Sequence, residues 1–403
     1  MLGPSPFTSP FGVSPFGTHH NKPEPTAPEL QKEATAERYV NFVADYSGCG
    51  HWRVLWPELI INSTGVGLSQ STTAMVADPR WYQGVKCVKV QRQCSTPQKE
   101  FVEHLKKIQN EMGFKIIYEV DDVVFREEIP DYNKFKPAFD NDEVRSNCID
   151  IINLCDEVTV TCPFMRDLYR EKTGKQEITV VPNFLPQFWM GNLFDGKQVA
   201  RSHEVNKRKP RVLYTGSGAH YDVDNKTGGK DDLSHVRDYI RSTVNKYQWV
   251  FVGAFPPQLV DLVQSREIEF HPWQNLLEYP GKIASLNVQL MIAPLEVNNF
   301  NRAKSDIKFI EACALGIPCL CQDMCTYSTA PSDLRFGTSE ELSDKIDTIL
   351  AWKNRSKYYG NISKLRAIAD DRLLEDPRNI GAFIETLRTP YGDPSRKLLS
   401  RFE

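Results

Sequence analysis

The stretch of sequence that decides the fold runs from residue 304 to residue 320 and reads KSDIKFIEACALGIPCL. Apolar or small side chains recur in it at helical spacing, at Ile307, Ile310, Cys313 and Ala314. This spacing predicts a helix with one face in a core. Gly316 is placed to cap the C-terminus of that helix, and Pro318 prevents the helix from continuing. The apolar residues around Pro318 then predict a short buried strand.

The same helix carries a polar edge. Lys304, Lys308 and Glu311 follow one another at i, i+4 and i+7 and therefore share one side. Two cations and a carboxylate at a helix N-terminus suit an anionic, hydroxyl-rich ligand such as a nucleotide sugar. An ordinary solvated helix face with i,i+4 pairing explains the same pattern, so the rest of the chain has to decide between the two.

Length and composition indicate a globular protein of two domains. The chain has 403 residues, of which 40% are hydrophobic and 25% are charged. The net charge of −3 argues against a generally basic nucleic-acid binder and against a cationic membrane-binding surface, although a local basic groove stays compatible with it. No apolar run approaches roughly 18 residues and no secretory signal pattern opens the sequence, so we expect no membrane span and a cytoplasmic location.

Ten cysteines are spread along the chain. Most of them lie in apolar segments, which indicates reduced core thiols in a cytoplasmic protein. Four cluster near the helix described above, at Cys313, Cys319, Cys321 and Cys325. Because their spacing fits no common zinc site, we expect no metal there.

The chain divides into an arm and two halves. Residues 1–36 are rich in Pro, Ser, Thr and Gly and repeat Ser-Pro-Phe, which predicts a disordered, Pro-rich N-terminal arm. Strand and helix patterns alternate over residues 37–195 and again over residues 196–374, with a polar, basic interval near the junction. This alternation predicts α/β domains with parallel sheets and right-handed crossovers. Such sheets bind ligands at the carboxyl ends of their strands, so the cleft between the domains is the natural site.

The predicted strands cover residues 39–44, 85–90, 115–120, 157–161, 178–181, 211–216, 249–253, 268–270 and 288–293, and one more follows Pro318. The predicted helices cover residues 97–112, 142–154, 163–172, 232–246, 257–265, 276–285, 304–315, 342–354, 358–371 and 378–388.

A glycine-containing turn follows the first strand. Gly48 and Gly50 would let the backbone approach a phosphate, and the segment after them can supply helix N–H donors. A plain turn explains these glycines equally well. His51 and Arg53 are placed to reach a ligand, or else they are surface residues.

Adjacent carboxylates, Asp121 and Asp122, follow the apolar strand at 115–120. Charged groups at such a position are costly unless they are solvated, paired or used. We expect one of them to bind sugar hydroxyls or to act as a general base. A capping aspartate on a loop and a pair that holds a divalent cation are the alternatives.

The second half repeats this arrangement. Gly216 and Ser217 end its first strand in a small-residue turn that suits phosphate contact, and Lys230 is placed to pair with a diphosphate. Asn301 stands among several asparagines just ahead of Lys304, and exposed amides suit hydroxyl-rich ligands. Trp273 either packs against a base or belongs to the core.

Taken in order, these motifs resemble those of GT-B glycosyltransferases, most of all the large retaining family 4. The matching motifs lie at residues 47–50, 118–122, 180–183, 213–217, 293–295 and 311–318. The likeness covers roughly residues 38–370, and its order along the chain is more specific than any one motif.

The resemblance implies two Rossmann-like domains that face a central cleft, with a C-terminal helix in 375–403 packed back on the first, acceptor-binding domain. It implies sugar transfer from a UDP- or GDP-sugar to a hydroxyl, with retention and without an obligatory cofactor or metal. Catalytic roles would fall to Asp121, Asp122 and Glu311. The residues expected to bind the donor are Gly48, Gly50, Gly216, Ser217, Lys230, Asn301, Lys304, Lys308 and Glu311, and those expected to bind the acceptor are His51 and Arg53.

Two positions depart from the family pattern. Ala303 stands where a second glutamate is usual, and Ser217 stands where an arginine is common. The first departure supports a different class of function, a catalytically inactive GT-B binding module. The presence of Lys304, Glu311 and Asp121 favours an active enzyme. A two-domain sugar-phosphate epimerase is a further alternative.

The acceptor is inferred by likeness. Some bacteriophage enzymes of this fold glycosylate hydroxymethylated DNA bases, so our preferred acceptor is 5-hydroxymethylcytosine in double-stranded DNA, within the cytoplasm of a bacterial host. Such an acceptor requires a flipped base and a local basic groove. The groove would draw on Lys86, Lys89, Arg92, Lys99 and the cluster at 201–211. A cell-surface polysaccharide or another glycan is the alternative acceptor.

Overall fold

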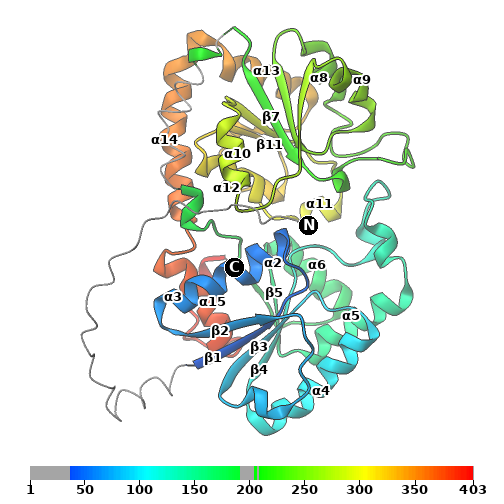
Figure 1. Ribbon diagram of the computed structural model, residues 1–403, viewed down its shortest axis with the longest axis vertical. Coiled ribbons are helices and arrows are strands. Elements are labelled where there is room, and N and C mark those ends of the chain that lie inside the picture. The colour runs from blue at the N-terminus through cyan, green and yellow to red at the C-terminus, as the bar shows by residue number, and fades with distance from the viewer. Residues whose placement is uncertain (1–36, 191–203, 207, 403) are drawn as a thin grey trace, which may run out of the picture. The chain divides into compact units, whose positions relative to one another are not determined.

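Two parallel sheets of six strands each carry the fold in the computed structural model of the protein, which describes residues 37–190, 204–206 and 208–402 (Figure 1). The first sheet with its helices is termed the first lobe below, and the second sheet with its helices the second lobe. The predicted arm at 1–36 and the predicted domain boundary at 195–196 lie outside the described residues.

The first lobe has the strand order β2-β1-β3-β4-β5-β6. Its strands are β1 (Glu37–Phe42), β2 (Gly67–Thr72), β3 (Val85–Gln91), β4 (Lys115–Glu119), β5 (Glu157–Val160) and β6 (Ile178–Val180). Its helices are α2 (Gly48–Gly50), a π-helical turn (His51–Leu55), α3 (Trp56–Thr64), α4 (Thr96–Met112), α5 (Asp142–Leu154) and α6 (Pro163–Thr173). Val88, Ile116 and Val158 are fully buried on neighbouring central strands, as expected for a parallel sheet covered on both faces.

The second lobe has the strand order β12-β11-β10-β7-β8-β9. Its strands are β7 (Arg211–Gly216), β8 (Gln248–Gly253), β9 (Ile268–Pro272), β10 (Leu290–Ala293), β11 (Cys319–Gln322) and β12 (Arg335–Phe336). Its helices are α8 (Arg237–Thr243), α9 (Val260–Gln264), α10 (Tyr279–Ser285), α11 (Asn299–Arg302), α12 (Ile307–Ala314), α13 (Ser339–Leu350) and α14 (Arg355–Asp371). The paired strands described in both sheets are parallel, so the carboxyl ends of the strands of each sheet lie along one edge.

Helix α12 ends where the sequence predicted, but it begins later than predicted. Gly316 adopts a left-handed conformation with φ of 66°, and Ile317 N–H donates to the carbonyl of Ala312 at 2.9 Å, which closes the helix as predicted. The helix begins at Ile307, so Lys304 precedes it. The predicted helical edge therefore holds for Lys308 and Glu311 but is wrong for Lys304.

Other elements differ from the predicted ones at their ends. The helix predicted for 232–246 is reduced to α8, because residues 231–236 form turns in which Asp231 and Asp232 are buried. Strands β2 and β12 were not predicted. β2 is rich in Gly, Ser, Gln and Thr, and β12 has only two residues, so neither shows an apolar pattern.

The chain crosses between the lobes twice, and the two crossings touch. Leu185, which follows β6, donates its N–H to the carbonyl of Arg372 at 2.8 Å, and Leu374 N–H donates to the carbonyl of Leu185 at 2.8 Å. Arg372 also binds the carboxylate of Asp306, at 2.9 and 3.0 Å, and the carbonyl of Asn183 at 2.7 Å. The junction is thus fixed by both backbone and side-chain hydrogen bonds.

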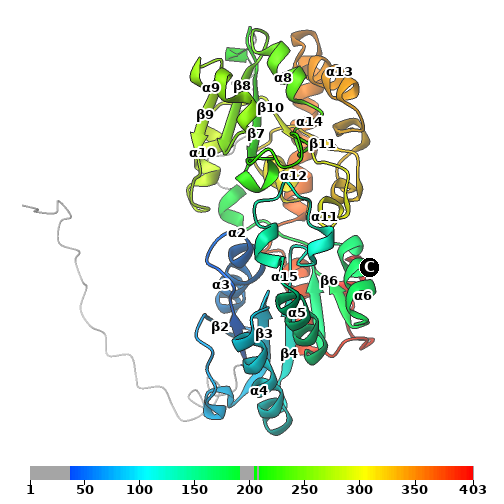
Figure 2. The same cartoon turned by 90° about the vertical axis from the view of Figure 1, so that its right-hand side faces the viewer.

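Helix α15 (Pro377–Arg388) and the segment after it return to the first lobe (Figures 1 and 2). Arg388 donates to the hydroxyl of Tyr39 at 2.8 Å and to the carbonyl of Val66 at 2.8 Å. Arg396 grips the fully buried carboxylate of Glu157 through two hydrogen bonds, at 2.6 and 2.7 Å. A segment that follows the second lobe in sequence therefore completes the packing of the first.

All ten cysteines lie in the described part of the chain as free thiols. Six of them are buried, namely Cys87, Cys148, Cys155, Cys313, Cys319 and Cys321. Over the described ranges, no helix is long and apolar enough to cross a membrane, and no cluster of three His, Cys, Asp or Glu side chains is arranged to hold a metal.

Candidate functional site

A cavity of about 940 Å³ lies between the carboxyl ends of β7 and β8 and the turn that follows β1. We term it the interlobe cavity. The first lobe contributes Ser47, Gly48, Cys49, Trp52, Asp121, Lys134 and Phe135. The second lobe contributes among others Gly216, Ser217, Gly218, His220, Phe255, Phe270, Trp273, Tyr279, Lys308 and Glu311. Six predicted site residues thus meet here: Gly48, Asp121, Gly216, Ser217, Lys308 and Glu311.

The turn after β1 is built on Asp45. Its carboxylate accepts hydrogen bonds from the N–H groups of Ser47 at 2.8 Å and Gly50 at 3.3 Å. A Cβ atom on Gly50 would lie 1.8 Å from the carbonyl oxygen of Asp45, so only glycine fits at this position. Gly48 lines the cavity, and a Cβ on it would meet open space. Gly50 therefore shapes the turn and, contrary to the sequence-based expectation, does not face the cavity.

Bare backbone forms the floor of the cavity where β7 and β8 end together. Gly216 and Gly253 are register partners, and Gly253 has a φ of 98°. A Cβ on Gly253 would lie 2.5 Å from the carbonyl oxygen of Gly216 and 3.2 Å from the ring of Trp273. A glycine is therefore required at this point by both conformation and space.

Aromatic rings form one wall beside this floor. Phe255 and Phe270 pack edge to face with their centroids 4.9 Å apart, and Trp273 stands 62% exposed at the cavity. An exposed indole next to bare backbone offers a flat apolar surface to a planar ring. The alternative that placed Trp273 in the core is therefore wrong, and its indole is available to pack against a base.

Lys308 and Glu311 project from α12 into the cavity and carry shifted pKa values. Burial lowers the pKa of Lys308 to about 8, and its ammonium lies 3.4 Å from the Tyr214 hydroxyl and 4.7 Å from the centre of that ring. Burial raises the pKa of Glu311 to about 8, against the opposing charge of Lys308. At pH 7 the carboxyl is therefore mostly protonated and can donate a hydrogen bond, while the amine is mostly charged.

Asp232 is the centre of a buried polar network at the back of the cavity. One carboxylate oxygen lies 2.6 Å from Nδ1 of His220. The other accepts hydrogen bonds from the hydroxyl of Tyr132 at 2.7 Å, the amide of Asn301 at 2.6 Å and the N–H of Glu296 at 3.0 Å. Burial lowers the pKa of His220 to about 4, so at pH 7 the imidazole is neutral, and its Nδ1–H donates a hydrogen bond to the ionised Asp232.

This network contains residues that sequence reasoning missed. His220 follows the predicted Gly216-Ser217 turn, but Asp232 was assigned to a helix, and Tyr132 carried no signal because it lies in a loop of the other lobe. Asn301 is fully buried in the network and does not line the cavity. The direct ligand contact predicted for Asn301 is therefore replaced by a hydrogen bond to Asp232.

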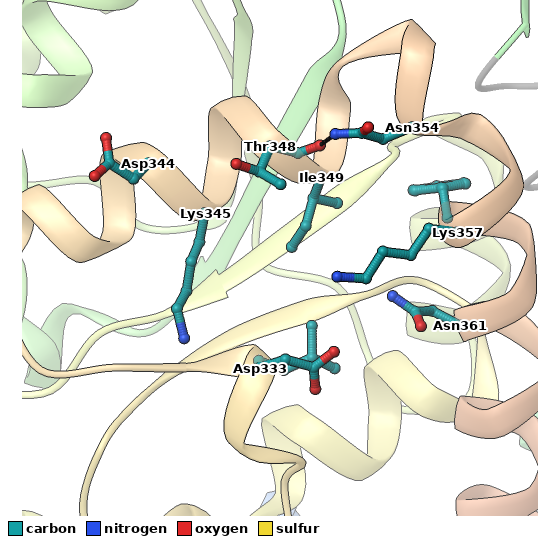
Figure 3. A pocket seen from close by; sticks show the side chains of 10 residues that line it. Asp333, Asp344, Lys345, Thr348, Ile349, Asn354, Lys357 and Asn361 are labelled. Atoms are coloured by element: carbon teal, nitrogen blue, oxygen red, sulfur yellow. Dashed lines mark hydrogen bonds between the residues drawn. The ribbon is translucent and has the colours of Figure 1, made fainter.

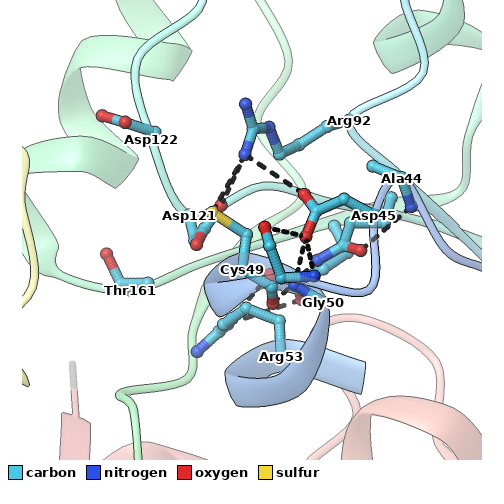
Figure 4. Close-up of polar contacts among 12 residues, drawn as sticks. Ala44, Asp45, Cys49, Gly50, Arg53, Arg92, Asp121, Asp122 and Thr161 are labelled. Carbon is cyan, nitrogen blue, oxygen red and sulfur yellow. Dashed lines mark hydrogen bonds and ion pairs between the residues drawn. The ribbon is translucent and has the colours of Figure 1, made fainter. Parts of the chain in front are cut away.

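Asp121 lies at the other side of the cavity, in a charged cluster of the first lobe (Figure 4). The guanidinium of Arg92 lies 3.8 Å from Asp121, 4.0 Å from Asp45 and 3.0 Å from the sulfur of Cys49. Burial raises the pKa of Asp121, and Arg92 opposes that shift. Arg92 itself has a φ of 50°, a left-handed conformation that is uncommon for a non-glycine residue.

Asp122 differs from Asp121 in that it faces its own loop instead of the cavity. Its side chain accepts a hydrogen bond from the N–H of Val123 at 3.0 Å and does not line the cavity. Figure 4 shows it apart from the Arg92 cluster. The loop-capping alternative therefore describes Asp122, and the catalytic role predicted for it has no geometric support.

The remaining predicted residues lie away from the cavity. Arg53 is fully buried and donates to Glu119 at 2.7 Å, to the carbonyl of Val181 at 2.6 Å and to Asn183 at 3.0 Å. The guanidinium of Arg53 thus belongs to a buried structural ion pair. It is not available for the acceptor contact predicted for it. His51 lies within hydrogen-bond distance of the Ser47 carbonyl, at 2.7 Å, and is not among the cavity residues.

Two lysines predicted to bind the donor, Lys230 and Lys304, also lie outside the cavity. Lys230 is exposed outside the cavity. Lys304 is half-buried, with its ammonium 4.4 Å from the centre of the Phe300 ring, and it does not line the cavity. Of the lysines predicted to bind a donor, Lys308 alone is therefore placed to do so directly.

A smaller cavity of about 300 Å³ lies beside α13 and α14 (Figure 3). None of the predicted site residues lines it. Its Lys345 is bound to the backbone carbonyls of Ser332 and Arg335, and its Asn354 donates to the carbonyl of Thr348 at 2.6 Å. We therefore place the functional site in the interlobe cavity.

Comparison with known proteins yields structural neighbours alone. No protein-family model matches the chain, and none of the curated proteins does. The solved structure of Anabaena Alr3699/HepE in complex with UDP is similar at 11% identity and a TM-score of 0.55, covering 87% of this chain and 99% of the other. The same protein in complex with UDP-glucose gives 10% identity, a TM-score of 0.56, and coverage of 87% and 100%.

A third structure is more distant. An alpha-glucosyltransferase in complex with UDP and a DNA that contains an HMU base matches at 9% identity with a TM-score of 0.44, over 91% of this chain and 98% of the other. The likeness to HepE and the two parallel sheets establish the architecture. The chain has the two-domain α/β fold of the GT-B type, as predicted from the sequence.

Proposed function

We propose that this protein is a glycosyltransferase that binds a nucleoside-diphosphate sugar in the interlobe cavity and transfers the sugar to a hydroxyl group. The observation that carries the proposal is the meeting of Lys308, Glu311 and the bare Gly216–Gly253 floor in one cavity of about 940 Å³. A cation for phosphate, a protonated carboxyl for hydroxyls and backbone without side chains are what such a donor requires.

The donor is proposed to lie along the second lobe. Its base packs against the wall of Phe255, Phe270 and Trp273. Its diphosphate lies over Gly216, Ser217 and Gly218 within reach of Lys308, and its sugar points to Glu311 and Asp121. The HepE structures, which hold UDP and UDP-glucose in the same fold, support a uridine donor; GDP-sugars remain the alternative.

The chemistry we propose is transfer with retention. The bond between the anomeric carbon and the donor phosphate breaks, and the acceptor oxygen bonds to the same face of that carbon. The departing phosphate oxygen takes the acceptor proton, and Lys308 stabilises the negative charge that develops on the phosphate. Asp121 positions the reacting groups, and Glu311 donates a hydrogen bond to a sugar or ribose hydroxyl.

The proposed acceptor is a hydroxyl, with 5-hydroxymethylcytosine in DNA as the candidate favoured by the sequence. Three of the basic residues assigned to a DNA groove are buried or ion-paired: Lys89 is buried, Arg92 contacts Asp121, and Lys99 binds Asp150 at 2.6 Å. Lys86 is exposed, and part of the cluster at 201–211 lies outside the described residues. This geometry favours a glycan acceptor, whereas the sequence favours DNA. The first acceptor panel therefore contains both.

The test is direct. UDP and GDP are titrated against the wild-type protein by calorimetry, and a panel of nucleotide sugars is then incubated with hydroxymethylcytosine DNA and with glycans, with mass detection of products. Transfer or donor hydrolysis supports the enzyme, and the anomeric coupling constant of the product reports retention or inversion. Nucleotide binding without turnover of any donor would favour the inactive binding module, and absence of nucleotide binding would overturn the proposal.

A further inference from the structure

A loop of the first lobe, residues 120–141, reaches across to the second lobe and enters the interlobe cavity. Tyr132 donates its hydroxyl to Asp232 at 2.7 Å, and Glu128 accepts a hydrogen bond from the Asn299 amide at 2.9 Å. Both contacts fix the loop on the second lobe. Two residues beyond Tyr132, Lys134 lines the cavity.

Lys308 alone does not balance the charge of a diphosphate bound in the cavity. Among the described residues that line it, the cationic side chains are Lys134 and Lys308, because His220 is neutral at pH 7. A nucleotide-sugar diphosphate carries two negative charges, and Lys308 offers one positive charge. Ser217 occupies the position where the resemblance leads one to expect an arginine, and a serine supplies no charge.

Lys134 is placed over the turn where the diphosphate is proposed to bind. Its ammonium nitrogen lies 3.5 Å from the point where a Cβ on Gly218 would stand, so the missing side chain of Gly218 leaves room for it. Within the described ranges, no carboxylate lies at ion-pair distance from Lys134, and its ammonium lies over the ring of Phe135, 5.1 Å from the centroid. Lys136 on the same loop is instead paired with Asp131 at 2.7 Å.

We propose that Lys134 is the second cation of the diphosphate site and reaches it from the opposite lobe, over a turn in which Ser217 supplies no charge. This inference rests on the proposed function, because it assigns a ligand contact within the proposed donor site. Its consequence is that the diphosphate bridges the lobes: Lys308 holds it from the second lobe and Lys134 from the first.

The test compares Lys134→Gln with Lys136→Gln, two variants that remove the same charge from the same loop. UDP and uridine are titrated against each by calorimetry, with GDP and guanosine replacing them if the wild-type protein binds GDP instead. We expect Lys134→Gln to weaken diphosphate binding about tenfold or more, the loss expected for one charge-assisted hydrogen bond, and to leave nucleoside binding unchanged. Lys136→Gln should match the wild type, and Lys134→Arg should restore much of the affinity.

The outcomes separate this inference from the proposed function. If the wild type binds UDP or GDP and Lys134→Gln binds it within twofold of the wild type, the assignment of Lys134 is overturned while the proposed function stands. Equal weakening of nucleoside and diphosphate would also overturn the assignment, because it would indicate a disturbed loop. If the wild type binds neither nucleotide, both inferences are overturned together.

Discussion

The hydroxyl of Tyr132 donates to the carboxylate of Asp232 across 2.7 Å, and this hydrogen bond ties a loop of the first lobe to the polar network behind the cavity. Asp232 keeps its other partners, His220, Asn301 and Glu296, without it. The bond therefore serves to place the loop more than to satisfy the carboxylate.

Tyr132→Phe should weaken donor binding through this loop. Loss of the hydroxyl is expected to cost about 1 kcal/mol of stability and to raise the Kd for UDP about fivefold, because Lys134 is no longer held over the turn. Calorimetry and thermal unfolding measure the two effects. Tyr239→Phe is the matched control, since the Tyr239 hydroxyl donates to Asp347 at 3.3 Å away from the cavity. Equal UDP affinity in the wild type and Tyr132→Phe would contradict the role of the loop.

Binding of UDP-glucose should fall as the pH rises from 7 to 9. Lys308 and Glu311 both titrate at about 8, so with increasing pH the amine loses its positive charge and the carboxyl gains a negative one. The first change removes an attraction to the anionic diphosphate and the second adds a repulsion, so we expect a loss of affinity of about tenfold or more. A Kd measured by calorimetry at several pH values reports the effect.

Glu311→Gln provides the control for this profile. Glutamine resembles the protonated acid, so the variant should bind UDP-glucose at pH 7 nearly as well as the wild type and should show a flatter profile above it. A profile of Glu311→Gln that coincides with that of the wild type at every pH would show that Glu311 does not titrate in this range.

Asp121→Ala should abolish sugar transfer and spare donor binding. The carboxylate faces the cavity from the first lobe, opposite the floor on which the donor is proposed to lie. Misplaced reacting groups cost at least about a hundredfold in rate, so kcat should fall by that amount or more while the Kd for UDP stays within a fewfold. Asp122→Ala is the neighbouring control, because Asp122 caps its own loop. Near-normal turnover in Asp121→Ala would remove Asp121 from the mechanism.

Gly253→Ala should damage both stability and the cavity floor. A methyl group at φ of 98° is strained and would lie 2.5 Å from the carbonyl oxygen of Gly216, so we expect a loss of about 1–3 kcal/mol and a marked loss of UDP affinity. Gly281→Ala in α10 is the matched control, because a Cβ there meets nothing within 4 Å, and it should be neutral or slightly stabilising. Thermal unfolding distinguishes the two; equal melting temperatures would contradict the steric argument.

The sequence predicted the architecture because its signals are local. The period of Ile310 and Cys313, the cap at Gly316 and the stop at Pro318 depend on neighbouring residues, and all of them appear in the structure. β2 escaped prediction because it forms an edge of the sheet with few apolar residues.

The site was predicted less completely, because several contacts depend on chain segments far apart. Arg53 looked like an exposed cation, and its burial against Glu119, 66 residues away, was not visible in the local pattern. The role of Tyr132 requires Asp232, 100 residues further along the chain. Lys134 owes its place at the site to the loop that carries it over Gly218 in the other lobe, a contact between residues 84 positions apart that no local pattern indicates.

The return of the chain to the first lobe orders the assembly of the molecule during synthesis. The strands of the second lobe occupy one continuous span, β7 to β12, so this sheet can form as soon as that span has left the ribosome. The strands of the first lobe also form one continuous span, β1 to β6, but Glu157 on that sheet meets Arg396 only after a further 239 residues have been synthesised. During that interval the first lobe exposes the surface that α15 will cover, and a nascent chain stalled before residue 377 should be recognised by chaperones at that surface.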